Sequence, residues 1–110
     1  MTAYAIGHLR DVTFGPEIVE YLERIDATLA PFGGEFIVHG ARPTVHEGSW
    51  EGDVVIIGFP DLATARAWYE SDAYQALVPL RAENSHSTVL LVDGCEAGHL
   101  GRDLISQLTG

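Results

Sequence analysis

Two histidines and one arginine have the side chains best suited to acid–base chemistry in this chain. His8 and His39 lie in segments with strand-like patterns, and an imidazole there could take a proton from an acidic carbon or a phenol near neutral pH. Arg81 follows Tyr74 and Leu77 at helical spacing, and its guanidinium could hold a carboxylate or enolate with two hydrogen bonds. We predict His8 and His39 as catalytic residues and Arg81 as a substrate-binding residue. The alternatives are histidines with structural or dimer contacts and a surface ion pair for the arginine.

Aromatic side chains accompany the arginine on the same predicted helical stretch. We predict Trp68, Tyr69 and Tyr74 as further substrate-binding residues, with Trp68 mainly a packing residue and a tyrosine hydroxyl reaching into a pocket. Glu47 and Trp50 lie in a glycine-containing loop, where an acidic residue is more often a turn partner than an acid catalyst. We predict a structural role for both, with hydrogen bonds from Glu47 holding the loop.

No metal or nucleophile motif is present in the sequence. His46, His86 and His99 are scattered, without the i, i+4 spacing of a zinc helix, so we predict no metal site and no cofactor. Cys95 has no basic neighbour that would lower its pKa, which argues against a catalytic thiol.

The charge balance restricts the partners. Sixteen acidic residues face six basic ones, all arginines, for a net charge of −10. A nucleic-acid backbone and an anionic membrane surface both require clustered positive charge, so we predict neither as a partner. The N-terminal residues lack the pattern of a signal peptide, and the lone cysteine fits a reducing compartment. We therefore expect a cytoplasmic protein.

Hydrophobic periodicity and turn residues predict four strands and at least two helices. The first helix begins at Gly15-Pro16 and ends near Pro31, and the second is capped by Asp61. A shorter helical piece starts at Ser71-Asp72, with distortion expected at Pro79. The strands are expected at residues 3–10, 35–42, 53–59 and 87–92, followed by a turn at 93–94 and a weak helix around 103–108.

This order, βαββαβ, predicts an α+β, ferredoxin-like domain over residues 1–94, with residues 95–110 as a C-terminal extension. Its four-stranded antiparallel sheet would carry helices on one face only. The first strand alternates small residues with Tyr4, Ile6 and His8, so the small side should face the helices. His39 should share its strand face with Glu35 and Ile37. The remaining face is too apolar to leave in water, which predicts a homodimer; the alternative cover is the C-terminal extension.

An ordered set of short motifs carries a family resemblance over about residues 3–94. The set comprises Gly33–Phe36, Gly40, Glu47–Trp50, Phe59-Pro60, Trp68–Tyr74 and Leu80-Arg81. Together they resemble the domain of unknown function 1330 family (DUF1330), which has the dimeric α/β-barrel form of the ferredoxin-like fold. The resemblance implies a homodimer with a pocket between sheet and helices, and Arg81 matches the family's arginine. It implies no particular reaction, because the superfamily includes cofactor-independent monooxygenases, lactone isomerases, aldoxime dehydratases and haem-degrading enzymes.

Three functions therefore remain open at the level of sequence. The favoured one is a cofactor-independent enzyme of isomerase, cyclase or monooxygenase type, acting on a small apolar or aromatic molecule. The alternatives are a non-catalytic dimer that binds a small molecule and a purely structural dimer without a usable pocket.

Overall fold

The computed structural model describes residues 2–109 of the chain. Its elements are, in chain order, β1 (Ala3–Arg10), α1 (Pro16–Leu29), the 3₁₀ turn η1 (Ala30–Phe32), β2 (Glu35–Val38), β3 (Asp53–Phe59), α2 (Leu62–Glu70), α3 (Asp72–Gln75), α4 (Val78–Ala82), β4 (His86–Asp93), the 3₁₀ turn η2 (Gly101–Asp103) and α5 (Leu104–Thr109). None of the helices described is long and apolar enough to cross a membrane.

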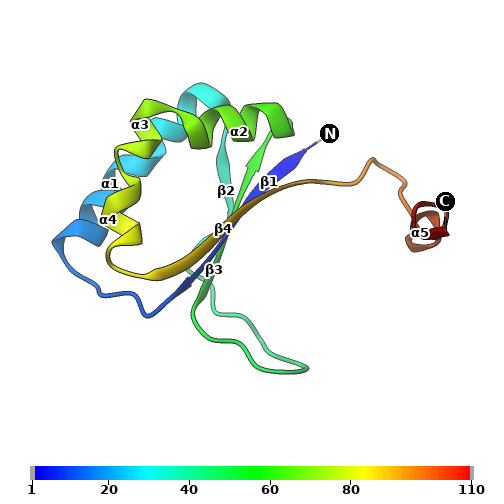
Figure 1. The fold of residues 1–110 in the computed structure, drawn as a ribbon, viewed down its shortest axis with the longest axis horizontal. Coiled ribbons are helices and arrows are strands. Elements are labelled where there is room, and N and C mark those ends of the chain that lie inside the picture. Colours follow the sequence, from blue (N-terminus) through cyan, green and yellow to red (C-terminus); the bar gives the residue numbers. More distant parts are fainter. Residues whose placement is uncertain (1, 110) are drawn as a thin grey trace.

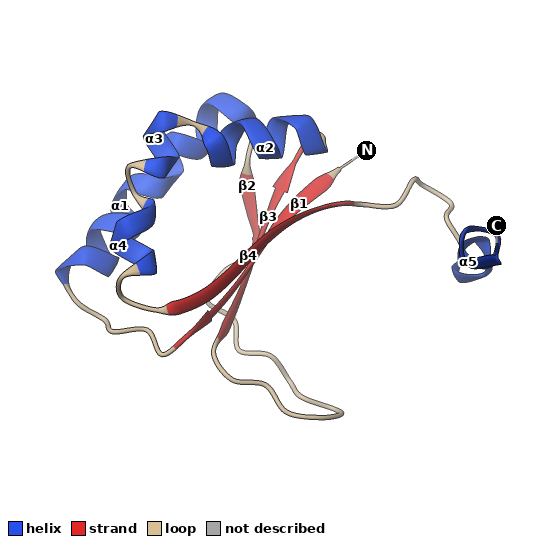
Figure 2. Cartoon of the chain, viewed as in Figure 1, coloured by secondary structure: helices blue, strands red, loops and turns tan. Residues whose placement is uncertain are grey.

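The strands form one antiparallel sheet in the order β2-β3-β1-β4, and α1 to α4 lie over one of its faces (Figures 1 and 2). This is the predicted α+β, ferredoxin-like arrangement with a single helix layer. No helix of residues 2–109 lies over the second face (Figure 1).

Alternation along β1 separates a closed side from an open side. Ala3 and Ala5 are buried beneath the helices, where their small side chains allow close packing. Tyr4, Ile6 and His8 point to the other side and remain partly exposed. Antiparallel pairing aligns Ile6 with neighbours that share its face, namely Ile56 on β3 and Leu90 on β4. The result is an apolar face that, within residues 2–109, carries no helix.

Local sequence explains where α1 begins and ends. Pro16 occupies the first turn, where its missing N–H costs no helical hydrogen bond. After the 3₁₀ turn, Gly33 adopts a left-handed conformation with φ of 66°, which glycine accepts without strain. At Gly34 a Cβ atom would approach Phe59 within 2.7 Å, so the chain can turn back to the sheet only with glycine there.

The second helical region is divided into three pieces by its own capping residues. The Asp61 carboxylate accepts a hydrogen bond from the Thr64 N–H at 2.7 Å, as predicted for an N-cap. Ser71 ends α2 and caps α3, where its hydroxyl accepts from the Tyr74 N–H. The distortion expected at Pro79 is a break in the helix: α3 ends at Gln75, and Pro79 lies in the first turn of α4, where proline is tolerated.

The strand β2 is shorter than predicted, and its irregularity moves His39. Phe36 pairs with Ile57, but Val38 pairs with Ile56, so one extra residue enters β2 between them. Such a bulge reverses the alternation of side chains beyond it. The prediction that His39 shares a face with Glu35 and Ile37 was therefore wrong: its ring stacks on Phe36, with centroids 4.3 Å apart.

Two segments project from the domain on the side away from the helices (Figure 1). One is the loop between β2 and β3; the other is the chain beyond β4, which ends in α5. The radius of gyration is 15.8 Å, against about 13 Å for a compact domain of this length. Gly94 does not turn as predicted, because its N–H donates to the Thr2 carbonyl at 2.8 Å and extends the sheet. The helix α5 carries exposed apolar residues, with Leu108 76% exposed.

Candidate functional site

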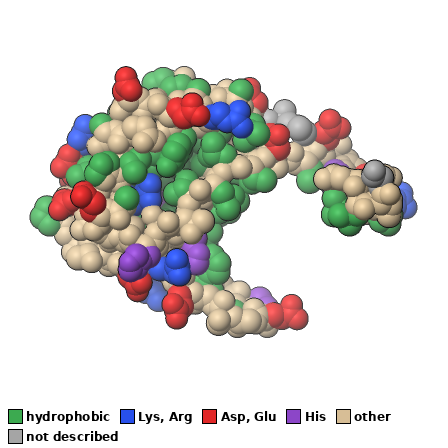
Figure 3. Space-filling model, viewed as in Figure 1, with side chains coloured by type: hydrophobic (Ala, Val, Ile, Leu, Met, Phe, Trp, Pro, Cys, Tyr) green, Lys and Arg blue, Asp and Glu red, His purple; other side chains and the backbone are tan. Residues whose placement is uncertain are grey.

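A cavity of about 290 Å³ lies between the helix layer and the sheet. Its walls are mainly apolar and come from β1, β3 and α1, including Ala5, Ile18, Ile25 and Val55. Hydrophobic side chains gather between helices and sheet in Figure 3, with a basic side chain among them. A cavity of about 150 Å³ is enough for benzene, so this one has room for a molecule of one or two rings. The third alternative from the sequence, a dimer without a pocket, does not fit this observation.

The opening of the cavity is marked by the lining residues that are exposed. They include Val12 and Phe14, from the connection between β1 and α1, and His39 and Gly40, which follow β2. Gly7 lines the interior, and a Cβ there would meet only ordinary contacts, the nearest at 3.4 Å. Glycine at this position therefore contributes to the free volume.

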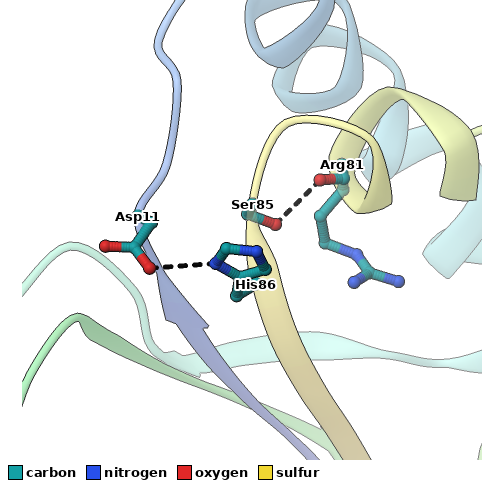
Figure 4. Close-up of polar contacts among 4 residues, drawn as sticks. All are labelled: Asp11, Arg81, Ser85 and His86. Carbon is teal, nitrogen blue, oxygen red and sulfur yellow. Dashed lines mark hydrogen bonds and ion pairs between the residues drawn. The ribbon is translucent and has the colours of Figure 1, made fainter.

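Arg81 supplies the positive charge of the cavity. The residue is only 5% exposed, and its Nη1 donates a hydrogen bond to the Ser87 hydroxyl on β4. Figure 4 shows its guanidinium extending away from Ser85, whose hydroxyl donates to the Arg81 carbonyl at 2.8 Å. Burial disfavours the charge, but the nearby Tyr74 and Tyr21 hydroxyls outweigh burial and raise the pKa of Arg81. The side chain therefore stays cationic although it is enclosed.

Tyr21 and Tyr74 form a hydroxyl pair at the same end of the cavity. Their oxygens are 2.7 Å apart, and both residues line the cavity. Burial, and then the proximity of Tyr74, raise the pKa of Tyr21 far above its ordinary range, so this phenol stays protonated. Trp68 packs against Tyr74 and donates its indole N–H to the Thr28 hydroxyl at 3.0 Å. The indole thus fixes the wall that positions the tyrosines.

The two predicted catalytic histidines lie on opposite faces of the sheet. His39 lines the cavity with Arg81, Tyr74 and Trp68. His8 lies on the open face, where its Nε2 is 2.6 Å from the Glu51 carbonyl oxygen and its ring stacks on Trp50 at 4.0 Å. The structure therefore brings one of the two histidines together with the arginine.

The other predicted residues have packing or loop roles in the geometry. Tyr69 packs against Trp68 and Tyr74 and is partly buried. Trp50 donates its indole N–H to the Gly52 carbonyl at 3.0 Å. Glu47 is exposed in the same loop, whose side-chain hydrogen bonds come from Trp50 and His8.

Two residues of the site were missed by sequence reasoning, although the sequence carries a signal for each. Tyr21 lies three residues after Ile18 and four before Ile25, which places it on the buried face of α1. Ser87 is the polar member of an alternating series with Val89 and Leu91 on β4, so it faces the helices.

Further electrostatic features lie outside the cavity. His86 Nδ1 and Asp11 Oδ2 lie 2.9 Å apart in a hydrogen bond that links the start of β4 to the end of β1 (Figure 4). Both side chains are well exposed, so the pair contributes little to stability.

Within residues 2–109, no group of three His, Cys, Asp or Glu side chains is arranged to hold a metal ion. Cys95 is exposed and free.

A family model described as "Domain of unknown function (DUF1330)" matches residues 2–95. The chain belongs to the DUF1330 family. No curated protein matches the sequence significantly.

Several solved structures are similar to this chain in fold. A dimeric ferredoxin-like protein of unknown function from Jannaschia sp. CCS1 is 14% identical, with a TM-score of 0.67, covering 86% of this chain and all (100%) of its own. A protein of unknown function from Rhodopseudomonas palustris is 15% identical, with a TM-score of 0.62 and coverage of 86% and 83%. SnoaB, a cofactor-independent oxygenase from Streptomyces nogalater, is 17% identical, with a TM-score of 0.57 and coverage of 90% and 98%. At these identities the similarity establishes the fold of this DUF1330 protein and not its reaction.

Proposed function

We propose that this DUF1330 protein is a homodimeric, cofactor-independent enzyme that acts on a small apolar or aromatic molecule in the cavity between helices and sheet. The observation that carries the proposal is the cavity itself, whose apolar walls converge on a few polar groups. This composition is typical of sites that bind small organic molecules. The similar fold of SnoaB, a cofactor-independent oxygenase, supports chemistry without a cofactor.

The chemistry follows from the groups that share the cavity. His39 takes the proton from an acidic C–H or phenol of the substrate, and the electron pair moves onto the substrate oxygen. Arg81 and a tyrosine hydroxyl stabilise the negative charge on that oxygen. The same anion is the first intermediate of an isomerisation, of a cyclisation or of an oxygenation in which O₂ is the co-reactant.

Dimerisation is proposed from the open face of the sheet. Ile37, Leu90 and Val92 on that face are 54%, 46% and 42% exposed. A contiguous apolar surface of this kind is rare on a monomer. A second copy packed on it would also cover His8, which then has a role as an interface residue. The similar Jannaschia protein is described as dimeric, which supports this arrangement.

Native mass spectrometry of protein purified from its own host tests the proposal first. We expect a dimer that carries a non-covalent small molecule. The adduct should be lost in Gly7→Leu, which fills the cavity, and kept in Gly7→Ala, for which the backbone has room. A monomer, or an adduct equally retained by Gly7→Leu, would contradict the proposal.

The recovered molecule then serves as the substrate in a turnover assay. We expect His39→Ala to lower turnover at least about a hundredfold, as is usual when a general base is removed. His8→Ala is the matched control on the other face and should remain active when assayed as a dimer. If the molecule is bound but neither wild type nor variant converts it, the protein is the non-catalytic binding dimer.

A further inference from the structure

The charge of Arg81 has no counter-ion in the part of the chain that the structure describes. Among residues 2–109 the only arginine with a carboxylate within 4.0 Å is Arg24, which pairs with Glu20 on the surface. Asp53 lines the same cavity but is exposed and makes no ion pair with the arginine. Enclosed charges in proteins are normally paired, because removal from water is costly for an isolated ion.

The guanidinium also has an unused donor. Nη1 donates one hydrogen bond to the Ser87 hydroxyl, but Nε is buried and has no hydrogen-bond partner among the described residues. An enclosed N–H without a partner costs free energy that a hydrogen-bond acceptor reaching it would recover. A carboxylate is such an acceptor, because a planar guanidinium binds it through two parallel hydrogen bonds.

The tyrosine pair has a further hydrogen-bond donor, as a count of its hydroxyl protons shows. Two phenols carry two protons, and only one proton can lie between oxygens that are 2.7 Å apart. The second hydroxyl proton of Tyr21 or Tyr74 is therefore free to bond a third group. Both tyrosines line the same cavity as Arg81, so the second proton is available to a group bound there.

We infer that the cavity binds a small organic monoanion, a carboxylate or enolate on an aromatic body of one or two rings, with its charge at Arg81 and the tyrosine pair. This inference rests on the proposed function and names its substrate class. The apolar walls take the rings, and the anion supplies the counter-ion and acceptor that the folded chain lacks. The chain's net charge of −10 opposes anions at long range, so binding depends on these short-range contacts.

An isosteric ligand pair tests the inference on the unmodified protein. We expect isothermal titration calorimetry to show 2-naphthoate binding at least about thirtyfold more tightly than 2-naphthamide, which has the same shape without the charge. Equal affinities, or no binding of 2-naphthoate, would overturn the inference. If 2-naphthamide binds as tightly and Gly7→Leu abolishes both, anion recognition fails while the proposed small-molecule cavity stands.

Variants of Arg81 and Tyr21 test which side chains cause the preference for the carboxylate over the amide. Arg81→Gln should reduce the carboxylate-to-amide ratio to near one, and Arg81→Lys should restore part of it, since a lysine keeps the charge without the planar fork. Tyr21→Phe removes one hydroxyl from the pair and should weaken 2-naphthoate several-fold with little effect on 2-naphthamide. This variant keeps the test decisive if the arginine variants do not fold, and an unchanged ratio in Tyr21→Phe would remove the tyrosine pair from the site.

Discussion

The eight residues of β1 alternate between two faces of the sheet, and the two faces have different roles. On the helix side, Ala3, Ala5 and Gly7 are so small that the helices close over the sheet and still leave a cavity. On the other side, larger side chains, Ile6 among them, form a broad apolar surface with no cover from the described chain. Small residues thus make room for a ligand, and large ones make a surface for a partner. The strand between them links the two sites physically.

The polar side chains on the two faces of the sheet also differ, both in burial and in hydrogen bonding. Arg81 and the tyrosine pair are enclosed, where the low dielectric strengthens each hydrogen bond and makes each unused donor costly. His8 on the open face already bonds a loop carbonyl and stacks on Trp50. The hydrogen-bond donors without a partner therefore belong to residues that line the cavity, and the binding proposal rests on them.

Adjacent residues on β3 offer the sharpest way to separate the faces. Ile57 is 5% exposed on the helix side, and Ile56 points to the open side. Ile57→Ala should lower the free energy of unfolding by roughly 2–5 kcal/mol at every protein concentration, as for other large-to-small core changes. Urea unfolding over a hundredfold concentration range measures this.

The Ile56→Ala variant is the control for that measurement. Its loss should shrink as the protein is diluted, because its packing partner belongs to the second copy. If both variants lose the same stability at all concentrations, the open face is packed within the single chain and the comparison fails.

A charge on the open face should break the dimer. Leu90 pairs with Ile6 across the sheet, so Leu90→Asp would place a carboxylate at the centre of the proposed interface. We expect the dimer dissociation constant to rise at least a hundredfold, about 3 kcal/mol, in sedimentation experiments. Ala67→Glu, on the exposed surface of α2, is the matched control and should leave the dimer unchanged. A dimer of unaltered affinity in Leu90→Asp would place the interface elsewhere.

The fold was predictable from the sequence because its signals are local and repeated. Strand alternation, the Pro16 helix start and the Asp61 cap each report on a few neighbouring residues, and all were confirmed. The same locality explains the errors. The bulge in β2 depends on pairing with β3, which no pattern within residues 35–42 reveals, so the face of His39 was assigned wrongly.

The site was predictable only in part, because it is assembled from distant segments. Arg81 stood out by residue type and by family resemblance. Its partners come from α1 and β4, and their roles depend on hydrogen bonds between side chains far apart in the sequence. Tyr21 and Ser87 could be predicted to face inwards, but an inward-facing polar residue does not reveal which group it will contact.

The tyrosine pair on the helix side of the sheet makes the free energy of unfolding depend on pH. Folding raises the pKa of Tyr21, so above about pH 10 an unfolded tyrosine loses its proton while the folded Tyr21 keeps it. The unfolded state then binds fewer protons, and stability falls as the pH rises; below pH 10 both states are protonated and the effect vanishes. Relative to Tyr21→Phe, the wild-type protein should lose about 1.4 kcal/mol per pH unit above 10, measured by urea unfolding. Identical slopes would show that Tyr21 loses its proton as readily in the folded chain as in the unfolded one.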